Sequence, residues 1–184
     1  MLYLILYLIL IFSLLIFLIF MSAYGLSLIY SSIMGAPYVP TKKSLALEIL
    51  KEVKFKKNGL FVELGSGDGR IIRAAVKNYP IRGMAVDINS LLIIWSKFLS
   101  RLDGTYPRID FVCKNILDVD LSKTDYLYLF LFPALIEKLI PGFNKELKKG
   151  TVIISHGFPV NEYKKKLIKQ VDRRPFPTYY YKIS

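Results

Sequence analysis

The sequence predicts an α/β protein with a doubly wound, mostly parallel seven-stranded sheet, preceded by one N-terminal transmembrane helix. Three observations support this prediction. The first 41 residues contain no charged side chain, short apolar segments alternate with helical ones from residue 44 onward, and a glycine-rich turn follows the first predicted strand. Because strand, helix and strand in succession form right-handed crossovers, the alternation favours a parallel sheet. We therefore divide the chain into an anchor at residues 1–34 and an α/β domain at residues 35–184.

The anchor prediction depends on residues 2–20, which are all Leu, Ile, Phe or Tyr except Ser13. A helix of about 20 apolar residues spans a hydrocarbon core roughly 30 Å thick. Residues 22–32 are richer in small and hydroxylated side chains, so we expect them to leave the lipid as an interfacial extension. A cleaved signal peptide would need a basic start and a shorter apolar core, and a buried core helix would have a polar face. Neither alternative matches this segment.

The charges that follow the anchor predict its orientation. Six lysines and two glutamates lie between residues 42 and 57, close enough to the span for the positive-inside rule to act. We therefore expect a single-pass membrane protein with its α/β domain on the cytoplasmic side. The formal net charge of +12 suits a domain held beside anionic headgroups, where each Lys or Arg contributes roughly 1 kcal/mol. We find no recognition helix or RNA-binding motif and expect no nucleic acid partner.

Periodicity and turn residues predict the individual elements of the domain. Residues 44–53 have the apolar stripe of an amphipathic helix. Residues 126–132 are almost entirely apolar, as expected of a central parallel strand covered on both faces. Pro141 and Gly142 are expected to break the helix predicted at residues 134–147. The other predicted elements are strands at residues 60–64, 84–86, 109–113 and 151–155, helices at residues 71–76 and 90–102, and a closing strand pair at residues 166–171 and 178–183.

The single cysteine, Cys113, limits the chemistry that the domain can carry. One cysteine excludes an intramolecular disulfide and a cysteine-based metal cluster, and we expect no metal site. Because Cys113 lies in a predicted strand, we expect it to be a small core residue.

The turn after the first predicted strand carries the most informative motif, because ligands of open α/β sheets bind beyond the carboxyl ends of the strands. Glycine lets a backbone turn sharply and approach a ligand closely. A dinucleotide fingerprint would need glycine at positions 65, 67 and 70, but position 70 is Arg70. Acidic residues flank the turn, which suits a ligand with an amino group and hydroxyls, such as S-adenosylmethionine, better than a pyrophosphate. The predicted cofactor-binding residues here are Glu63, Gly65, Ser66, Gly67, Asp68 and Gly69.

Three further residues fit the same ligand. Asp87 ends the second predicted strand, 24 residues after Glu63, where a carboxylate can accept hydrogen bonds from both ribose hydroxyls. Asn115 and Ile116 follow the third predicted strand, where an amide can contact the edge of adenine and an apolar side chain its face. The alternatives are that each acid is a solvated strand end and that Asn115 is an ordinary turn residue.

The glycine turn together with Asp87 resembles motifs I and II of the class I, seven-strand methyltransferases. Residues 37–41 (Pro-Tyr-Val-Pro-Thr) and residues 155–158 (Ser-His-Gly-Phe) resemble a narrower group. That group contains the archaeal protein lysine methyltransferase and the mitochondrial enzymes that methylate lysine on the adenine nucleotide translocase and the ATP synthase c-subunit. The chain has Gly157 where the archaeal pattern has an acid.

The resemblance implies a role for each matching residue. Glu63 and residues 65–69 would bind the methionine part of S-adenosylmethionine, Asp87 the ribose, and Asn115 would lie near adenine. Tyr38 and Thr41 would border the cofactor and the channel for the methyl acceptor.

A lysine acceptor must lose its ammonium proton before it attacks the methyl group, and desolvation in an aromatic channel promotes that loss. We expect Phe132 and Pro133 to line this channel, with Tyr38 opposite them. His156 is the only histidine and a candidate general base. The alternative, which we favour, is that His156 packs at the end of the fifth strand.

These observations predict an S-adenosylmethionine-dependent methyltransferase. Its expected acceptor is a lysine on a protein that the enzyme reaches at the membrane. Two alternatives remain open, namely methylation of a lipid or quinone, and a cofactor-binding membrane scaffold without catalysis.

Overall fold

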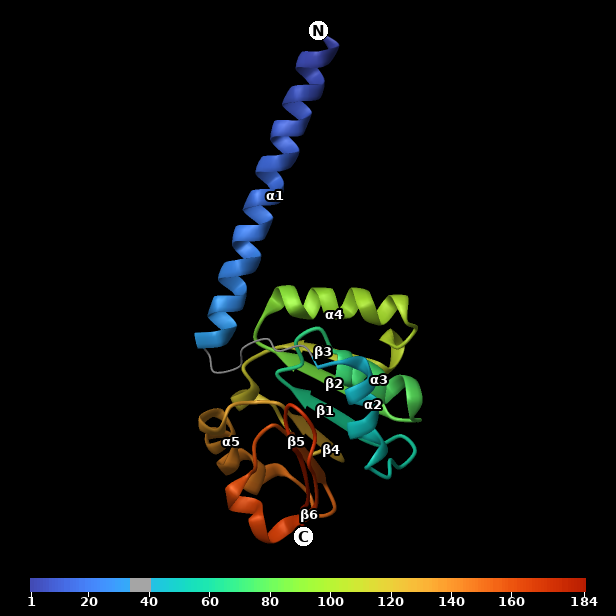
Figure 1. Cartoon of the computed structure of the whole chain (residues 1–184). Helices are drawn as coiled ribbons and strands as arrows, with labels where there is room; N and C mark the ends of the chain where they lie inside the picture. Colours follow the sequence, from blue (N-terminus) through green and yellow to red (C-terminus); the bar gives the residue numbers. More distant parts are fainter. Residues whose placement is uncertain (34–40) are drawn as a thin grey trace.

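The computed structural model describes residues 1–33 and 41–184. Residues Leu2–Ile33 form one continuous helix, α1, which extends away from the α/β body (Figure 1). Its segment Leu2–Leu26 has a mean hydropathy of 3.2 and is not buried against the rest of the protein. The Ser13 hydroxyl donates to the carbonyl oxygen of Leu10 at 2.8 Å, so this polar group is satisfied inside the helix. By length and composition, α1 is able to cross a membrane.

The sheet of the α/β body has seven strands in the order β3-β2-β1-β4-β5-β7-β6. Strands β1 to β5 are parallel, and β7 pairs antiparallel with both β5 and β6. The order reverses between β1 and β4, which is the switch point at which such sheets bind ligands. The strands are β1 (Leu60–Leu64), β2 (Arg82–Asp87), β3 (Ile109–Cys113), β4 (Tyr126–Leu129), β5 (Val152–His156), β6 (Leu167–Val171) and β7 (Thr178–Lys182). The predicted fold class is confirmed.

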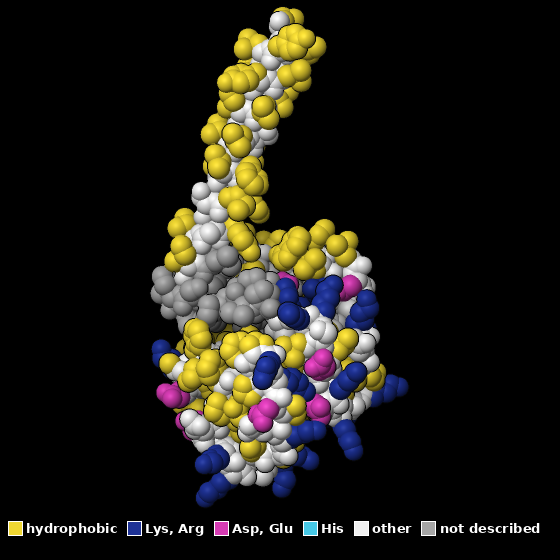
Figure 2. All heavy atoms as spheres, in the orientation of Figure 1, with side chains coloured by type: hydrophobic (Ala, Val, Ile, Leu, Met, Phe, Trp, Pro, Cys, Tyr) yellow, Lys and Arg dark blue, Asp and Glu magenta, His cyan; other side chains and the backbone are white. Residues whose placement is uncertain are grey.

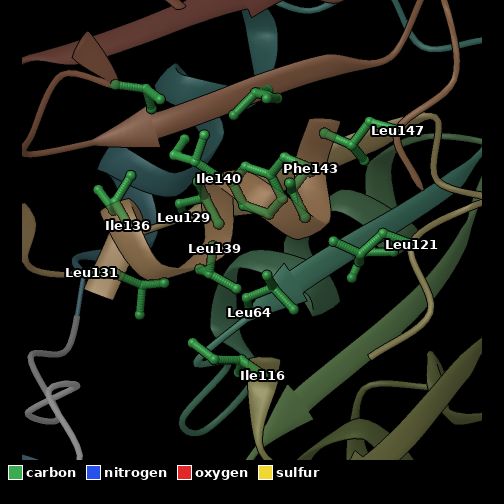
Figure 3. Packing of buried hydrophobic residues seen from close by; sticks show 14 of the residues in the cluster. Leu64, Ile116, Leu121, Leu129, Leu131, Ile136, Leu139, Ile140, Phe143 and Leu147 are labelled. Carbon is green, nitrogen blue, oxygen red and sulfur yellow. The ribbon is translucent and has the colours of Figure 1, made fainter. Parts of the chain in front are cut away.

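Helices cover both faces of the sheet (Figure 1). The helices α2 and α3 pack on one face together with α4, and α5 packs on the other. Successive strand residues alternate between the two faces, so Phe61 joins the core beneath α2 and α3 while Val62 joins the core beneath α5. Figure 3 shows the second core, where side chains of α5 meet Leu64 and Leu129. The helices are α2 (Lys43–Lys51), α3 (Arg70–Asn78), α4 (Ser90–Leu102) and α5 (Pro133–Glu146), with short 3-10 helices η1 (Tyr106–Arg108), η2 (Ile116–Asp118) and η3 (Asn161–Lys166).

Three sequence predictions about these elements are wrong. The helix α5 runs through Pro141 without a break, because burial of Ile140 and Phe143 on either side of the proline holds the segment in place. Strand β4 stops at Leu129, three residues earlier than predicted. Cys113 is exposed and not in the core, because it ends β3, which is the edge strand of the sheet.

Candidate cofactor-binding site

Three glycines shape the turn between β1 and α3. Gly65, Gly67 and Gly69 have φ angles of 72°, 55° and 71°, in the left-handed region that side chains with a Cβ rarely adopt. The backbone N–H groups of Gly65 and Ser66 both donate to the carbonyl oxygen of Val86, each at 2.9 Å. The turn is therefore fastened to the carboxyl end of β2, the strand that also carries Asp87.

Gly69 is required for a second reason, because α4 passes close behind it. A Cβ built on Gly69 would lie 2.1 Å from the Oγ atom of Ser96, which is a direct overlap. Gly69 is the N-cap residue of α3, so its close approach lets the first turn of α3 pack against α4. The glycine at this position is explained by packing as well as by backbone conformation.

Glu63 lies at the base of the turn and is buried. Its Oε2 atom accepts a hydrogen bond from the backbone N–H of Ile72 at 3.0 Å, which ties β1 to the first turn of α3. Burial raises the pKa of Glu63 well above its usual value, the Ile72 hydrogen bond opposes this increase, and the charges of Asp68 and Asp87 add to it. A cationic ligand group near Glu63 would offset this unfavourable burial of negative charge.

Asp87 links the turn to the start of α4. Its Oδ2 atom accepts from the backbone N–H of Gly67 at 2.7 Å, and its Oδ1 atom accepts from the N–H of Asn89 at 2.8 Å. Burial raises the pKa of Asp87, and these backbone hydrogen bonds oppose the increase. A carboxylate has about four acceptor sites, so Asp87 can still accept a further hydrogen bond. The geometry therefore suits a ligand with two neighbouring hydroxyls.

Asp68 forms a salt bridge with Arg70 at 2.7 Å, so its carboxylate already has a cationic partner within the protein. The Nη1 atom of Arg70 donates to the carbonyl oxygen of Thr41 at 2.6 Å. This pair holds the buried Thr41 next to the glycine turn, and the resemblance to the methyltransferases implies that Thr41 borders the cofactor. The Ser66 hydroxyl is buried and has no hydrogen-bond partner in the part of the chain that the structure describes, so a ligand could satisfy it.

The side of the site predicted to hold adenine is more exposed to solvent than the glycine turn. Asn115 is exposed, and its side-chain oxygen accepts from the N–H of Leu117 at 3.1 Å, so it caps η2. Ile116 is buried and belongs to the core beneath α5, where Figure 3 places it near Leu64. Ile116 therefore contributes to the core, and its contact with the face of adenine stays a prediction.

Tyr128 lies opposite Glu63 in the register of β1 and β4, and no local pattern in the sequence indicates this contact. Tyr128 is buried, and burial together with the Glu63 charge raises its pKa well above the usual value. The register of two strands that lie far apart in the chain is the only signal that could have found it.

Comparison with known proteins identifies the family. The ANTKMT methyltransferase domain matches residues 63–167, which is more than half of the chain. A protein-lysine N-methyltransferase from Saccharolobus islandicus (strain REY15A) is 32% identical over 137 residues, covering 74% of this chain and 85% of that protein. The chain belongs to the ANTKMT methyltransferase family.

Two further likenesses are to methyltransferases. A lysine N-methyltransferase of the ATP synthase c-subunit from Caenorhabditis elegans is 30% identical over 132 residues, which is 68% of each chain. The crystal structure of an RNA methyltransferase from Salinibacter ruber, in complex with S-adenosyl-L-homocysteine, has a TM-score of 0.74 and 26% identity, covering 79% of this chain and 94% of that one. The predicted enzyme class, an S-adenosylmethionine-dependent methyltransferase, and its cofactor are confirmed.

In this ANTKMT-family chain, the residues predicted to line the channel for the methyl acceptor follow the carboxyl end of β4, close to residues that follow β5. Phe132 is exposed, precedes Pro133 at the start of α5, and packs edge-to-face against Phe158 with ring centroids 5.9 Å apart. Gly157 has a φ of 88°, and a Cβ there would lie 2.9 Å from the ring of Phe130. Tyr38 lies outside the described residues.

His156 is the other predicted catalytic residue of this ANTKMT-family chain, and it is 1% exposed. Its Nδ1 atom lies 2.9 Å from the Thr178 hydroxyl, and the rings of Phe130 and Phe176 flank it. Burial, with a further contribution from the nearby Arg173 charge, lowers the pKa of His156 to about 4. These contacts agree with the alternative in which His156 packs at the end of β5.

Proposed function

We propose that this methyltransferase transfers the methyl group of S-adenosylmethionine to a lysine side chain of a protein that it meets at a membrane. The observation that carries the proposal is the pairing of the Asp87 carboxylate with the glycine turn, in a chain whose relatives are named as lysine N-methyltransferases of proteins and of the ATP synthase c-subunit. The geometry supports cofactor binding, and the relatives support the acceptor.

In this proposal, the residues around the turn each hold one part of the cofactor. Asp87 accepts the two ribose hydroxyls with the lone pairs that its backbone hydrogen bonds leave over. Glu63 compensates the ammonium of the methionine part, and the Ser66 hydroxyl donates to its carboxylate. Asn115 contacts the edge of adenine. Asp68 acts through Arg70, by holding Thr41 against the turn.

The bound cofactor supplies an electrophilic methyl group on its sulfonium, so the protein mainly has to align the acceptor. Proximity and alignment of this kind lower a barrier by about 7 to 11 kcal/mol in favourable cases. In this proposal, the aromatic pair Phe132 and Phe158 lines the entrance for the acceptor and offers an apolar wall that favours the neutral amine over the ammonium. Pro133 and Tyr38 remain the other predicted residues of this channel. His156 packs at the end of β5 against Thr178 of β7 and does not act as a general base.

The membrane part of the proposal depends on α1 and on the charges that follow it. We propose that residues 1–34 anchor the chain in a bilayer in a single pass and that residues 35–184 lie on the cytoplasmic side. The apolar segment Leu2–Leu26 supports the anchor. The six lysines between residues 42 and 57 support the orientation, by the positive-inside rule.

One labelling experiment tests the proposal against its alternatives. Membranes that contain the full chain are incubated with S-adenosylmethionine labelled in the methyl group, and label is measured in protein, lipid and RNA. We expect label in protein, recovered as methyllysine, and its loss in Asp87→Ala. The matched control is Asp110→Ala, which replaces an exposed acid of β3. Label in lipid would support the lipid or quinone alternative. Label in RNA would support the acceptor that the name of the Salinibacter ruber enzyme suggests.

A further inference from the structure

The outer face of α4 is an exposed apolar stripe. Ile94, Trp95, Phe98 and Leu102 are 62%, 50%, 47% and 70% exposed, and their spacing places them on one side of the helix. The Trp95 and Phe98 rings stack with centroids 5.4 Å apart. Figure 2 shows apolar side chains gathered over this helix, on the side of the body from which α1 departs. The opposite side of α4 packs into the protein through Leu92, Ile93, Ser96 and Ser100.

A basic pocket lies beneath the C-terminal half of the α4 stripe. The pocket has a volume of about 350 Å³, lies between α2, α3 and α4, and shares Leu102 with the stripe. Lys43, Arg70, Arg73 and Lys77 contribute its cationic lining. The two arginines are paired with carboxylates of the fold. Neither lysine forms an ion pair with any residue in the described ranges 1–33 and 41–184. Both lysines therefore offer positive charge to a group outside the fold.

We propose that α4 docks on the surface of an anionic bilayer, with its apolar stripe at the boundary between headgroups and acyl chains and the two lysines against lipid phosphates. A helix with aromatic residues on one face and basic residues beside it is typical of interfacial binding, and such faces enter the membrane by about 5–10 Å. Tryptophan favours this boundary in particular. The inference depends on the membrane anchoring in the proposed function and is independent of the methyl acceptor.

Two further observations favour a bilayer over a second copy of the chain. The net charge of +12 makes two copies repel each other, whereas anionic lipid attracts the same charge. The eight Cα steps from Ile33 to Thr41 span at most about 29 Å. The domain therefore stays tethered close to the end of α1, and α4 presents an apolar face that can meet the membrane surface there.

Docking through α4 would also fix the position of the methylation site. The helix begins at Ser90, directly after Asn89, whose N–H is bound to Asp87. A docked α4 therefore holds the carboxyl edge of the sheet close to the lipid surface. An acceptor lysine near that surface could reach the glycine turn without leaving the membrane.

The chain has a single tryptophan, Trp95, so its fluorescence reports on α4 alone. The full chain is reconstituted in vesicles of phosphatidylcholine and phosphatidylglycerol in which part of the lipid carries brominated acyl chains. We expect brominated lipid to reduce Trp95 emission at least twofold and aqueous acrylamide to have little effect. Phe98→Glu should abolish most of the lipid quenching. The matched control Ile168→Glu replaces an apolar residue on β6 that is also exposed, at the other end of the sheet, and should leave the quenching unchanged.

A charge-reversal variant tests the contact of the two lysines with lipid phosphates. The double substitution Lys43→Glu and Lys77→Glu should weaken lipid quenching in vesicles that contain phosphatidylglycerol and have little effect in pure phosphatidylcholine. Equal effects in both lipids would overturn the assignment of the two lysines to lipid phosphates.

Two results would overturn α4 docking. In the first, acrylamide quenches Trp95 and brominated lipid does not. In the second, Trp95 is shielded from both quenchers to an extent that grows with the protein-to-lipid ratio, which would identify a second copy as the occupant. Alkaline extraction of the same vesicles separates these results from a failure of anchoring, because a chain without a membrane span is released by it.

Discussion

Gly69→Ala should destabilise the protein through two separate costs. The φ of Gly69 is 71°, a conformation that costs a residue with a Cβ about 1–2 kcal/mol. The new Cβ would also overlap the Oγ atom of Ser96 at 2.1 Å, and overpacking of this kind costs about 1–3 kcal/mol. We therefore expect the free energy of unfolding to fall by about 2–5 kcal/mol.

Two further variants separate these costs. Gly104→Ala has a nearly identical φ of 73° with no atom near the new Cβ, so it should lose only about 1–2 kcal/mol. Ser96→Ala removes the overlapping hydroxyl, and the remaining Cβ of residue 96 lies 3.4 Å away. In that background, Gly69→Ala should cost no more than Gly104→Ala.

Urea unfolding of the detergent-solubilised full chain measures all of these free energies. Ser96→Ala alone should be neutral or stabilising, because the Ser96 hydroxyl is buried without a hydrogen-bond partner among the described residues. An equal cost of Gly69→Ala in the two backgrounds would refute the proposed packing of α3 against α4.

Three other substitutions follow from the geometry of the site. Glu63→Gln keeps an acceptor for the Ile72 N–H and removes a buried carboxylate whose pKa is raised, so the free energy of unfolding should rise by about 1 kcal/mol at pH 7. This gain over the native protein should grow as pH rises above about 4.5. Calorimetry should show weaker binding of S-adenosylhomocysteine. The pKa of His156 is lowered from 6.5 to about 4, so between pH 6.5 and pH 4 the unfolded chain binds more protons, and the folded protein loses stability as pH falls. His156→Asn should remove up to about 3 kcal/mol of this loss, measured as the difference in unfolding free energy between pH 7 and pH 4. Gly157→Ala should cost about 2–5 kcal/mol, from its φ of 88° and the ring of Phe130, and a loss no larger than that of Gly104→Ala would contradict this packing.

The local parts of the cofactor site could be predicted from the sequence. Glu63 and the glycine turn are adjacent in the chain, and Asp87 ends the next strand. Their proximity at one edge of a parallel sheet follows from the topology alone. The structure brings these residues together as expected, with Asp87 bound to Gly67.

The contacts that depend on tertiary packing could not be predicted. Ser96 reaches Gly69 only because α4 crosses behind α3. Tyr128 meets Glu63 through the register of β1 and β4. Pro141 stays helical because the core on both sides of it outweighs its local preference. In each case, the deciding contacts are made with residues far away in the chain.

Calorimetric titration of the detergent-solubilised chain with S-adenosylhomocysteine tests the central claim, that Asp87 and the glycine turn hold the cofactor. Asp87→Asn can no longer accept from both Gly67 and Asn89 while also binding two hydroxyls, so each lost charge-assisted hydrogen bond should cost about 1.5–3 kcal/mol. We predict affinity at least tenfold weaker for Asp87→Asn and unchanged affinity for the exposed control Asp110→Asn. Equal affinity of Asp87→Asn and the native chain would contradict the assignment of the site.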